Sequence, residues 1–392
     1  MKASAKRKLN YENHLISCLL TTCFELLHNN QKVAFNQVES GLDALYGMYP
    51  DTKSKTARIP AETRLDAAPE VEHLCAPSRI WKALNPDLEK EIIGLLMRFE
   101  RQLLVYRPLN ESKRTIQHRM SIYTHGESLI KSMPETFSSF SEALFWYSVL
   151  GKHISNRRAL KHFEDETNIP SPDPVAKEDV DSEVVTVLFE RFGQDVIQDQ
   201  MGRMIRWRDA FQPIYEHSRT PAGKADFLGA TALTVVMTIG APASVEECSI
   251  LLDNFRDEFA HVVKLTREML EFTADTAPRR GKFTYDDGIV APLYLVATRC
   301  RDPAIRREAI SLLRRYPCRE GVLDSSMAAA IGTWIMNTEE MEMEDGVIPA
   351  SARLAVAGAE LEIVNRMTYL TCSRQEPGGT RRILLPRVLL RW

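Results

Sequence analysis

The sequence has no long hydrophobic run. Its most apolar stretch, Phe227 to Ile239, is shorter than the roughly 18 consecutive apolar residues that a membrane-spanning helix needs, so we expect a buried core helix and no membrane partner. The N-terminus is basic but is followed by neither an apolar segment nor a small-residue cleavage site, which argues against a signal peptide. A solvated tail is the favoured interpretation of its Lys2, Lys6, Arg7 and Lys8, and a nuclear-import signal stays open.

Metal and nucleotide motifs are missing as well. The seven cysteines include no C-x-x-C pair and the sequence has no H-E-x-x-H motif, so no metal site is predicted. Their odd number and wide scatter indicate reduced thiols of a cytosolic or nuclear protein. Cys18 and Cys23 fit the apolar face of a helix. Neither G-x-G-x-x-G nor a P-loop occurs, and Pro377 to Gly379 predicts only a turn, so we predict no cofactor.

Excess positive charge is also lacking. Lys and Arg number 50 against 53 Asp and Glu, which gives a net charge of −3. The whole chain therefore lacks the positive field that non-specific nucleic-acid binding requires, and we expect no direct nucleic-acid contact. With 44% hydrophobic and 26% charged residues, the composition is that of a folded globular protein. A length of 392 residues allows one large helical domain or two fused ones.

Candidate catalytic residues are few. The nucleophile elbow G-x-S-x-G is absent, and its nearest approach, His125 with Ser128, falls in an expected loop. A second set imitates the aspartate-rich spacing with which terpene cyclases hold magnesium diphosphate: Asp253, Asn254, Asp257 and Glu258. No second metal-binding run follows it, so the solvated face of an amphipathic helix is the favoured explanation. We predict no catalytic residue and expect that the protein is not an enzyme.

The sequence does contain helical periodicity. Apolar residues recur at spacings of three and four from Glu12 to Asn29 and again from about Lys32 to Tyr46, which predicts an antiparallel helical hairpin. In the first helix a single buried face is expected, made of Leu15, Ile16, Leu19, Leu20, Cys23, Phe24 and Leu27. Further helices are predicted over 86–106, 138–154, 184–216 with a break near Gly193, 224–239, 244–270 and 302–316.

Start signals and strand patterns complete the fold prediction. Two pairs have the spacing of a capping box: Ser139 with Glu142, and Ser244 with Glu247. Asp302 followed by Pro303 marks another helix start. Only the C-terminal tail has strand character, and residues 354–361 and 367–372 predict a short β-hairpin. The predicted fold class is all-α, an irregular multi-helix array with a small C-terminal β-hairpin.

The chain is expected to have four segments. An N-terminal helical hairpin occupies 1–49, and a linker or surface loop occupies the proline-rich stretch 50–84. A helical body follows over 85–345, and the β-hairpin with the C-terminal tail covers 346–392. No fixed repeat of 20 to 50 residues is evident, so a regular solenoid is not expected.

Two charge runs lie near the end of the expected helical body. The basic run consists of Arg299, Arg301, Arg306, Arg307, Arg314 and Arg315. The acidic run consists of Glu339, Glu340, Glu342, Glu344 and Asp345. A solvated face is the favoured interpretation of both runs, while mutual pairing or a surface for a partner stays open.

One segment resembles a known family. Pro292 to Arg307 reads PLYLVATRCRDPAIRR, and with Arg319 to Gly321 and Asp324 to Ser325 it resembles the C-terminal part of the fungus-specific regulatory domain of zinc binuclear cluster transcription factors. Three other segments are similar to further parts of that domain: Pro134 to Glu142 (PETFSSFSE), Phe255 to Leu270, and Ile16 to Leu45. The resemblance implies an all-helical domain that regulates transcription of a pathway, often of secondary metabolism, sometimes by sensing a small apolar ligand. It assigns no functional residue, and the family's six-cysteine, two-zinc DNA-binding motif has no counterpart here.

What the resemblance implies is a nuclear, alternatively cytoplasmic, regulator that lacks its own DNA-binding domain. Such a protein would act through a protein partner, for example a full-length zinc cluster transcription factor, or through a small apolar effector. A competing hypothesis is a helical enzyme or accessory protein that acts on an apolar biosynthetic intermediate, because a fold does not fix a function. A third is an open reading frame whose DNA-binding exon lies upstream.

Overall fold

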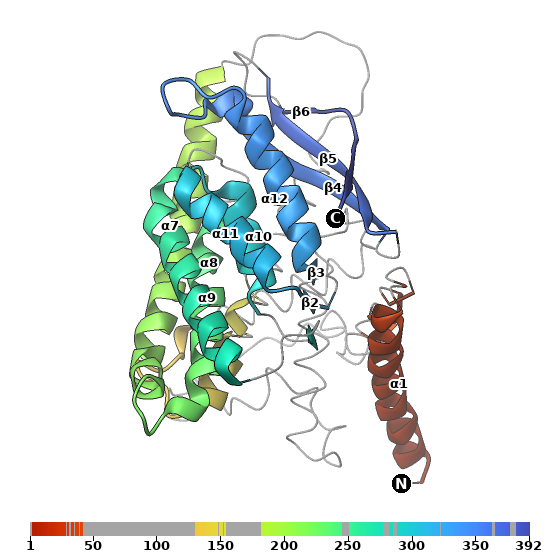
Figure 1. Ribbon diagram of the computed structural model, residues 1–392. Coiled ribbons are helices and arrows are strands. Elements are labelled where there is room, and N and C mark those ends of the chain that lie inside the picture. Colours follow the sequence, from red (N-terminus) through yellow and green to blue (C-terminus); the bar gives the residue numbers. More distant parts are fainter. Residues whose placement is uncertain are drawn as a thin grey trace.

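The computed structural model describes an N-terminal helix and much of the chain beyond residue 130 (Figure 1). The residues described are 2–28, 30, 33–34, 36–38, 40–41, 130–147, 149–151, 153, 182–244, 251–276, 282–284, 288–321, 323–362, 365–376 and 382–392. The expected linker over 50–84 and the expected helix over 86–106 lie outside them, so both stay predictions.

Helices dominate the described residues. They are α1 (Lys2–Leu27), α7 (Ser182–Ser218), α8 (Phe227–Ser244), α9 (Arg256–Thr276), α10 (Val290–Arg299), α11 (Pro303–Arg315) and α12 (Ser325–Glu340), with 3-10 turns at Lys224–Asp226, Leu251–Phe255 and Ala350–Ala352. In sequence order α7 packs on α8 and α8 on α9, while α10, α11 and α12 pack against one another and α10 also contacts α8. Figure 1 shows α12 between this helical body and a small sheet.

Several predicted helices are confirmed with shifted ends. The apolar stretch forms α8, whose Leu233, Val235 and Ile239 are buried as expected. No helix in the described part of the chain is both long and apolar enough to span a bilayer. The capping box before residue 140 is confirmed in one half, because Ser139 Oγ accepts from Glu142 N at 3.2 Å. The Glu142 carboxylate accepts from Ser138 N, one residue before the cap, at 2.6 Å.

The break expected near Gly193 is wrong, because α7 runs without interruption from Ser182 to Ser218. Glycine in a helix interior costs only about 1 kcal/mol relative to alanine, which packing of an amphipathic helix readily offsets. The same helix also contains Pro213, a stronger breaker, on its exposed side. Tertiary packing against α8 therefore overrides the local signal.

The C-terminal hairpin is confirmed, but a purely all-α class is wrong. Strands β4 (Leu354–Glu362) and β5 (Met367–Gln375) pair in antiparallel fashion, and β6 (Arg382–Leu384) and β7 (Val388–Arg391) both pair with β5 to complete a four-stranded sheet. A second sheet joins β1 (Lys282–Thr284), β2 (Cys318–Glu320) and β3 (Leu323–Asp324). The strands that were missed have two to four residues, too few to show the alternation by which a strand is recognised.

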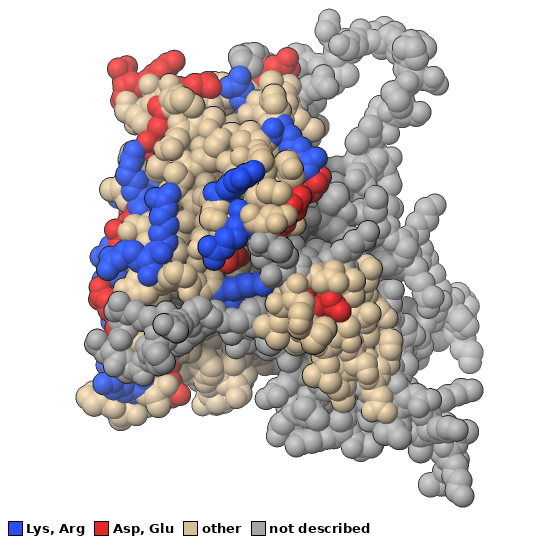
Figure 2. Space-filling view, turned by 45° about the vertical axis from the view of Figure 1, so that its right-hand side comes forward, with Lys and Arg blue, Asp and Glu red and all other residues tan. Residues whose placement is uncertain are grey.

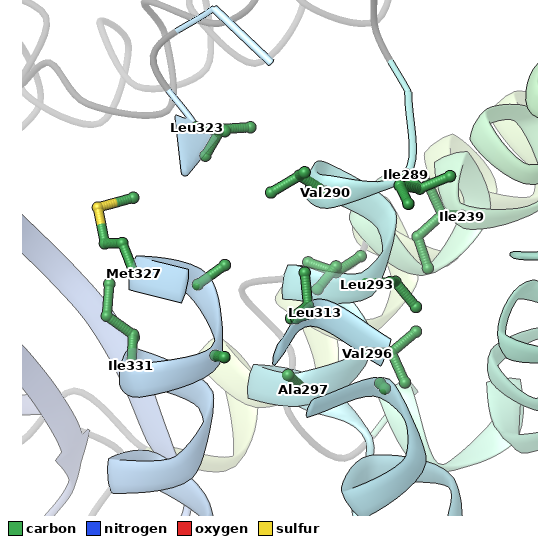
Figure 3. Packing of buried hydrophobic residues seen from close by; sticks show 14 of the residues in the cluster. Ile239, Ile289, Val290, Leu293, Val296, Ala297, Leu313, Leu323, Met327 and Ile331 are labelled. Atoms are coloured by element: carbon green, nitrogen blue, oxygen red, sulfur yellow. The ribbon is translucent and has the colours of Figure 1, made fainter. Parts of the chain in front are cut away.

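The largest core cluster surrounds α10. Figure 3 shows Leu293 and Val296 of α10 beside Leu313 of α11, with Met327 and Ile331 of α12 on the other side. A second cluster is aromatic and lies between α7, α8 and the helix that begins at residue 140. Its centre is Trp207, which is fully buried and stacks on Phe211 with ring centroids 4.8 Å apart. The two clusters meet at Tyr215, which packs against both.

Close approach of α10 and α12 depends on Gly332. A Cβ atom at this position would lie 2.6 Å from the Cβ of Ala297, closer than two such atoms can approach. We expect Gly332→Ala to lower the free energy of unfolding by about 1–3 kcal/mol, as overpacking typically does, despite the better helix propensity of alanine. Gly202→Ala on α7 is the control, because nothing lies within 4 Å of its added Cβ. Urea unfolding of both variants checks this, and an equal or higher stability of Gly332→Ala would contradict it.

The single buried face expected for the first helix is wrong in part. Leu15 and Leu19 are buried as expected, but Leu20, Phe24 and Leu27 are 66%, 57% and 54% exposed. Apolar residues thus occupy two opposite sides of α1, and only one side packs against the rest of the protein. When apolar residues occupy both sides of a helix, their spacing of three and four does not show which side is buried.

Candidate functional site

The segment that carries the family resemblance forms the joint between α10 and α11. Asp302 is the N-cap of α11, and its carboxylate accepts from the backbone N–H groups of Ala304 at 3.0 Å and Ile305 at 3.1 Å. Pro303 occupies the first helical position, where its missing N–H has no cost. Arg256 of α9 donates to the same carboxylate at 2.9 Å. The predicted start signal is therefore confirmed.

Capping of α11 by Asp302 has a testable pH dependence. The backbone N–H of Ile305, with Arg256 beside it, holds the pKa of Asp302 below its ordinary value. Stability from this group is therefore fully present above the ordinary pKa of aspartate and is lost as the pH falls through the lowered one. We expect Asp302→Ala to cost about 0.5–2 kcal/mol at neutral pH. Urea unfolding at a series of pH values should show the difference from wild type shrinking in acid, and a constant difference would contradict the assignment.

The centre of the site is a buried carboxylate, Glu339 at the end of α12. Its Oε2 accepts from Arg306 at 2.6 Å and its Oε1 from Arg301 at 2.8 Å. Arg306 and Glu339 are fully buried, and 9% of the Arg301 side chain is exposed. Arg306 also donates through Nε to the carbonyl of Ala297 at 2.9 Å. One carboxylate thus joins α12 to α11 and to the segment that links α11 with α10.

The same carboxylate connects the helices to the C-terminal sheet. Glu339 Oε1 accepts from the backbone N–H of Leu354, the first residue of β4, at 2.7 Å. Arg299 donates to the carbonyl of Leu354 at 3.3 Å. Arg353, the preceding residue, donates to Asp253 at 2.7 Å. The start of β4 is therefore fixed by side chains that come from α12, from α10 and from the turn before α9.

The favoured interpretation of the two charge runs as solvated faces is wrong for Arg301, Arg306 and Glu339. Besides Arg301 and Arg306 with Glu339, Arg307 pairs with Glu340. Glu342, in turn, pairs with Arg374 of β5 at 2.8 Å. The alternative that the two runs meet is confirmed for Glu339 and Glu340, whereas the partner of Glu342 lies outside the basic run. The paired residues of the two runs are 33 to 38 positions apart in the sequence, and the packing of α11 on α12 brings them together.

Burial shifts the pKa values of Arg301 and of two cysteine thiols, Cys300 and Cys318. Burial lowers the pKa of Arg301 to about 10. The negative charge of Glu339 opposes this shift, and the neighbouring arginines add to it. The guanidinium is still charged at neutral pH, so Glu339 supplies the opposite charge that it needs. Burial also raises the pKa of Cys300 to about 11 and that of Cys318 to about 12. Both thiols are therefore protonated at neutral pH and unsuited to nucleophilic attack or metal binding.

A second buried carboxylate, Glu320 of β2, was not recognised in the sequence. Its two oxygens accept from the backbone N–H groups of Gly288 at 3.2 Å, Ile289 at 2.8 Å and Val290 at 3.0 Å, at the start of α10. Ile289 occupies the N-cap position and cannot cap through its side chain. A carboxylate from a distant strand therefore satisfies these donors and the positive end of the helix dipole. The sequence hints at this contact only weakly. The start of α10 has no residue that could cap it, and Glu320 of the family-like segment follows Ile289 by 31 residues.

The other candidates do not come together. Asp253 pairs with Arg353, whereas Asp257 is 96% exposed and lies 3.8 Å from Arg256. Cys18 is buried in α1, in agreement with its expected packing role. No group of three or more His, Cys, Asp or Glu side chains that could hold a metal ion occurs within the described ranges. His125, Ser128, Glu247 and Pro377 to Gly379 lie outside those ranges.

Comparison with known proteins gives a partial sequence match. No family model matches the chain, and no solved structure matches it. Part of the chain is similar to a fungal transcription regulator. This relative is the aspercryptin biosynthesis cluster-specific transcription regulator of Emericella nidulans, with 34% identity over 85 residues. The match covers 20% of this chain and 14% of the regulator's length, so it supports a transcription-factor-like relationship and leaves the wider family resemblance untested.

Proposed function

We propose that this protein is a transcription-factor-like regulator of a fungal biosynthetic pathway, active in the nucleus through a protein partner or a small apolar effector. The observation that carries the proposal is the 34% identity over 85 residues to a regulator specific to one biosynthetic gene cluster. The motif of the resemblance has a structural role here, because Asp302 binds the backbone of α11 and Arg306 binds the buried Glu339. These contacts serve the fold of this region.

The proposed partner is a second transcription factor that supplies the DNA contacts. A net charge of −3 supports this division of labour, since binding to DNA backbone phosphates requires clustered positive charge. The partner would be a full-length zinc cluster protein, as the resemblance implies. Purified protein should then show no specific affinity for promoter DNA at physiological salt, whereas the two proteins together should be recovered on it.

The deciding experiment is deletion of the gene, with transcripts of the neighbouring genes and the metabolite profile recorded in the same cultures. A regulator predicts that several transcripts rise or fall together. Reintroduced wild type should restore them, and Glu339→Gln, which removes the buried counter-charge of α11, should not. Unchanged transcripts with one accumulating intermediate would overturn the proposal and identify an enzyme of the pathway.

A further inference from the structure

We draw no further inference here: the strongest candidate, the exposed apolar and acidic surface of the loop between α12 and β4 (residues 341–349), at the height where acidic side chains gather along the upper rim of the molecule in Figure 2, carries nothing because nothing in the described part of the structure shows what covers it.

Discussion

Replacing Glu339 by glutamine is expected to lower the free energy of unfolding by roughly 3–5 kcal/mol, the usual cost of removing one partner from a buried ion pair. Glutamine keeps the shape of the side chain, so no cavity forms. It brings no negative charge, however, and leaves Arg306, which is fully buried, without its counter-ion. The NH₂ group of the glutamine amide is also a donor, and it would face other donors. These are the guanidinium groups of Arg301 and Arg306 and the backbone N–H of Leu354. Urea unfolding followed by circular dichroism measures the loss.

Glu308→Gln is the matched control for this substitution. The chemical change is the same, and Glu308 also pairs with an arginine, Arg267 at 2.9 Å, but both side chains are at least one-third exposed. Such surface pairs contribute only about 0–1 kcal/mol, so the control should unfold close to wild type. A loss below about 1 kcal/mol for Glu339→Gln would mean that water reaches the pair and that the joint between helices and sheet does not depend on its charge.

Local signals accounted for what the sequence predicted well. The start of α11 follows from two adjacent residues, Asp302 and Pro303, whose effects need no distant partner. The hairpin of β4 and β5 follows from the apolar and β-branched character of residues 354–361 and 367–372, which are runs long enough to be recognised. Helix α9 was expected from its apolar spacing, and Phe259 and Val262 are buried as that spacing requires. Each of these features depends on residues that are close together in the sequence.

Features that the sequence did not predict depend on contacts between distant segments. Arg306 and Glu339 are 33 residues apart, and nothing local distinguishes them from charges on a solvated face. Glu320 caps α10 from a strand that has only three residues. The two sides of α1 are both apolar, so only the packed structure shows which one is buried. In each case tertiary packing, which no short window contains, decides the outcome.

The family-like segment, residues 292–307 with 319–321 and 324–325, makes contacts that stabilise the fold. A sequence resemblance in this segment therefore indicates a shared fold more directly than a shared activity. The charged residues of the segment bind within the protein: Asp302 caps α11, Arg306 neutralises Glu339, and Glu320 caps α10. A sequence that preserves them preserves the packing of α10, α11 and α12. The proposed partner or effector would have to be recognised by other surfaces, which can vary without disturbing this core.

Replacing Trp207 by alanine is expected to cost about 3–5 kcal/mol, as large-to-small changes of buried aromatic residues do. The side chain is fully buried and fills the centre of the second core cluster, where it stacks on Phe211. Its indole N–H also donates to the carbonyl of Ala143 at 3.1 Å, which ties α7 to the helix that begins at residue 140. Urea unfolding followed by circular dichroism, with tryptophan fluorescence as a second probe, measures the loss.

Two further variants separate the contributions of volume and hydrogen bonding at Trp207. Trp207→Phe keeps an aromatic ring but leaves the Ala143 carbonyl without its donor, so we expect an intermediate loss of about 1–3 kcal/mol. Ile205→Ala, on the same helix but 43% exposed, should change stability by about 0.5 kcal/mol at most. If Trp207→Ala unfolded no more easily than Ile205→Ala, the aromatic cluster would not be a core. Helix α7 would then be held by α8 alone, and its amide protons should exchange faster than those of α10, which is buried within the larger cluster.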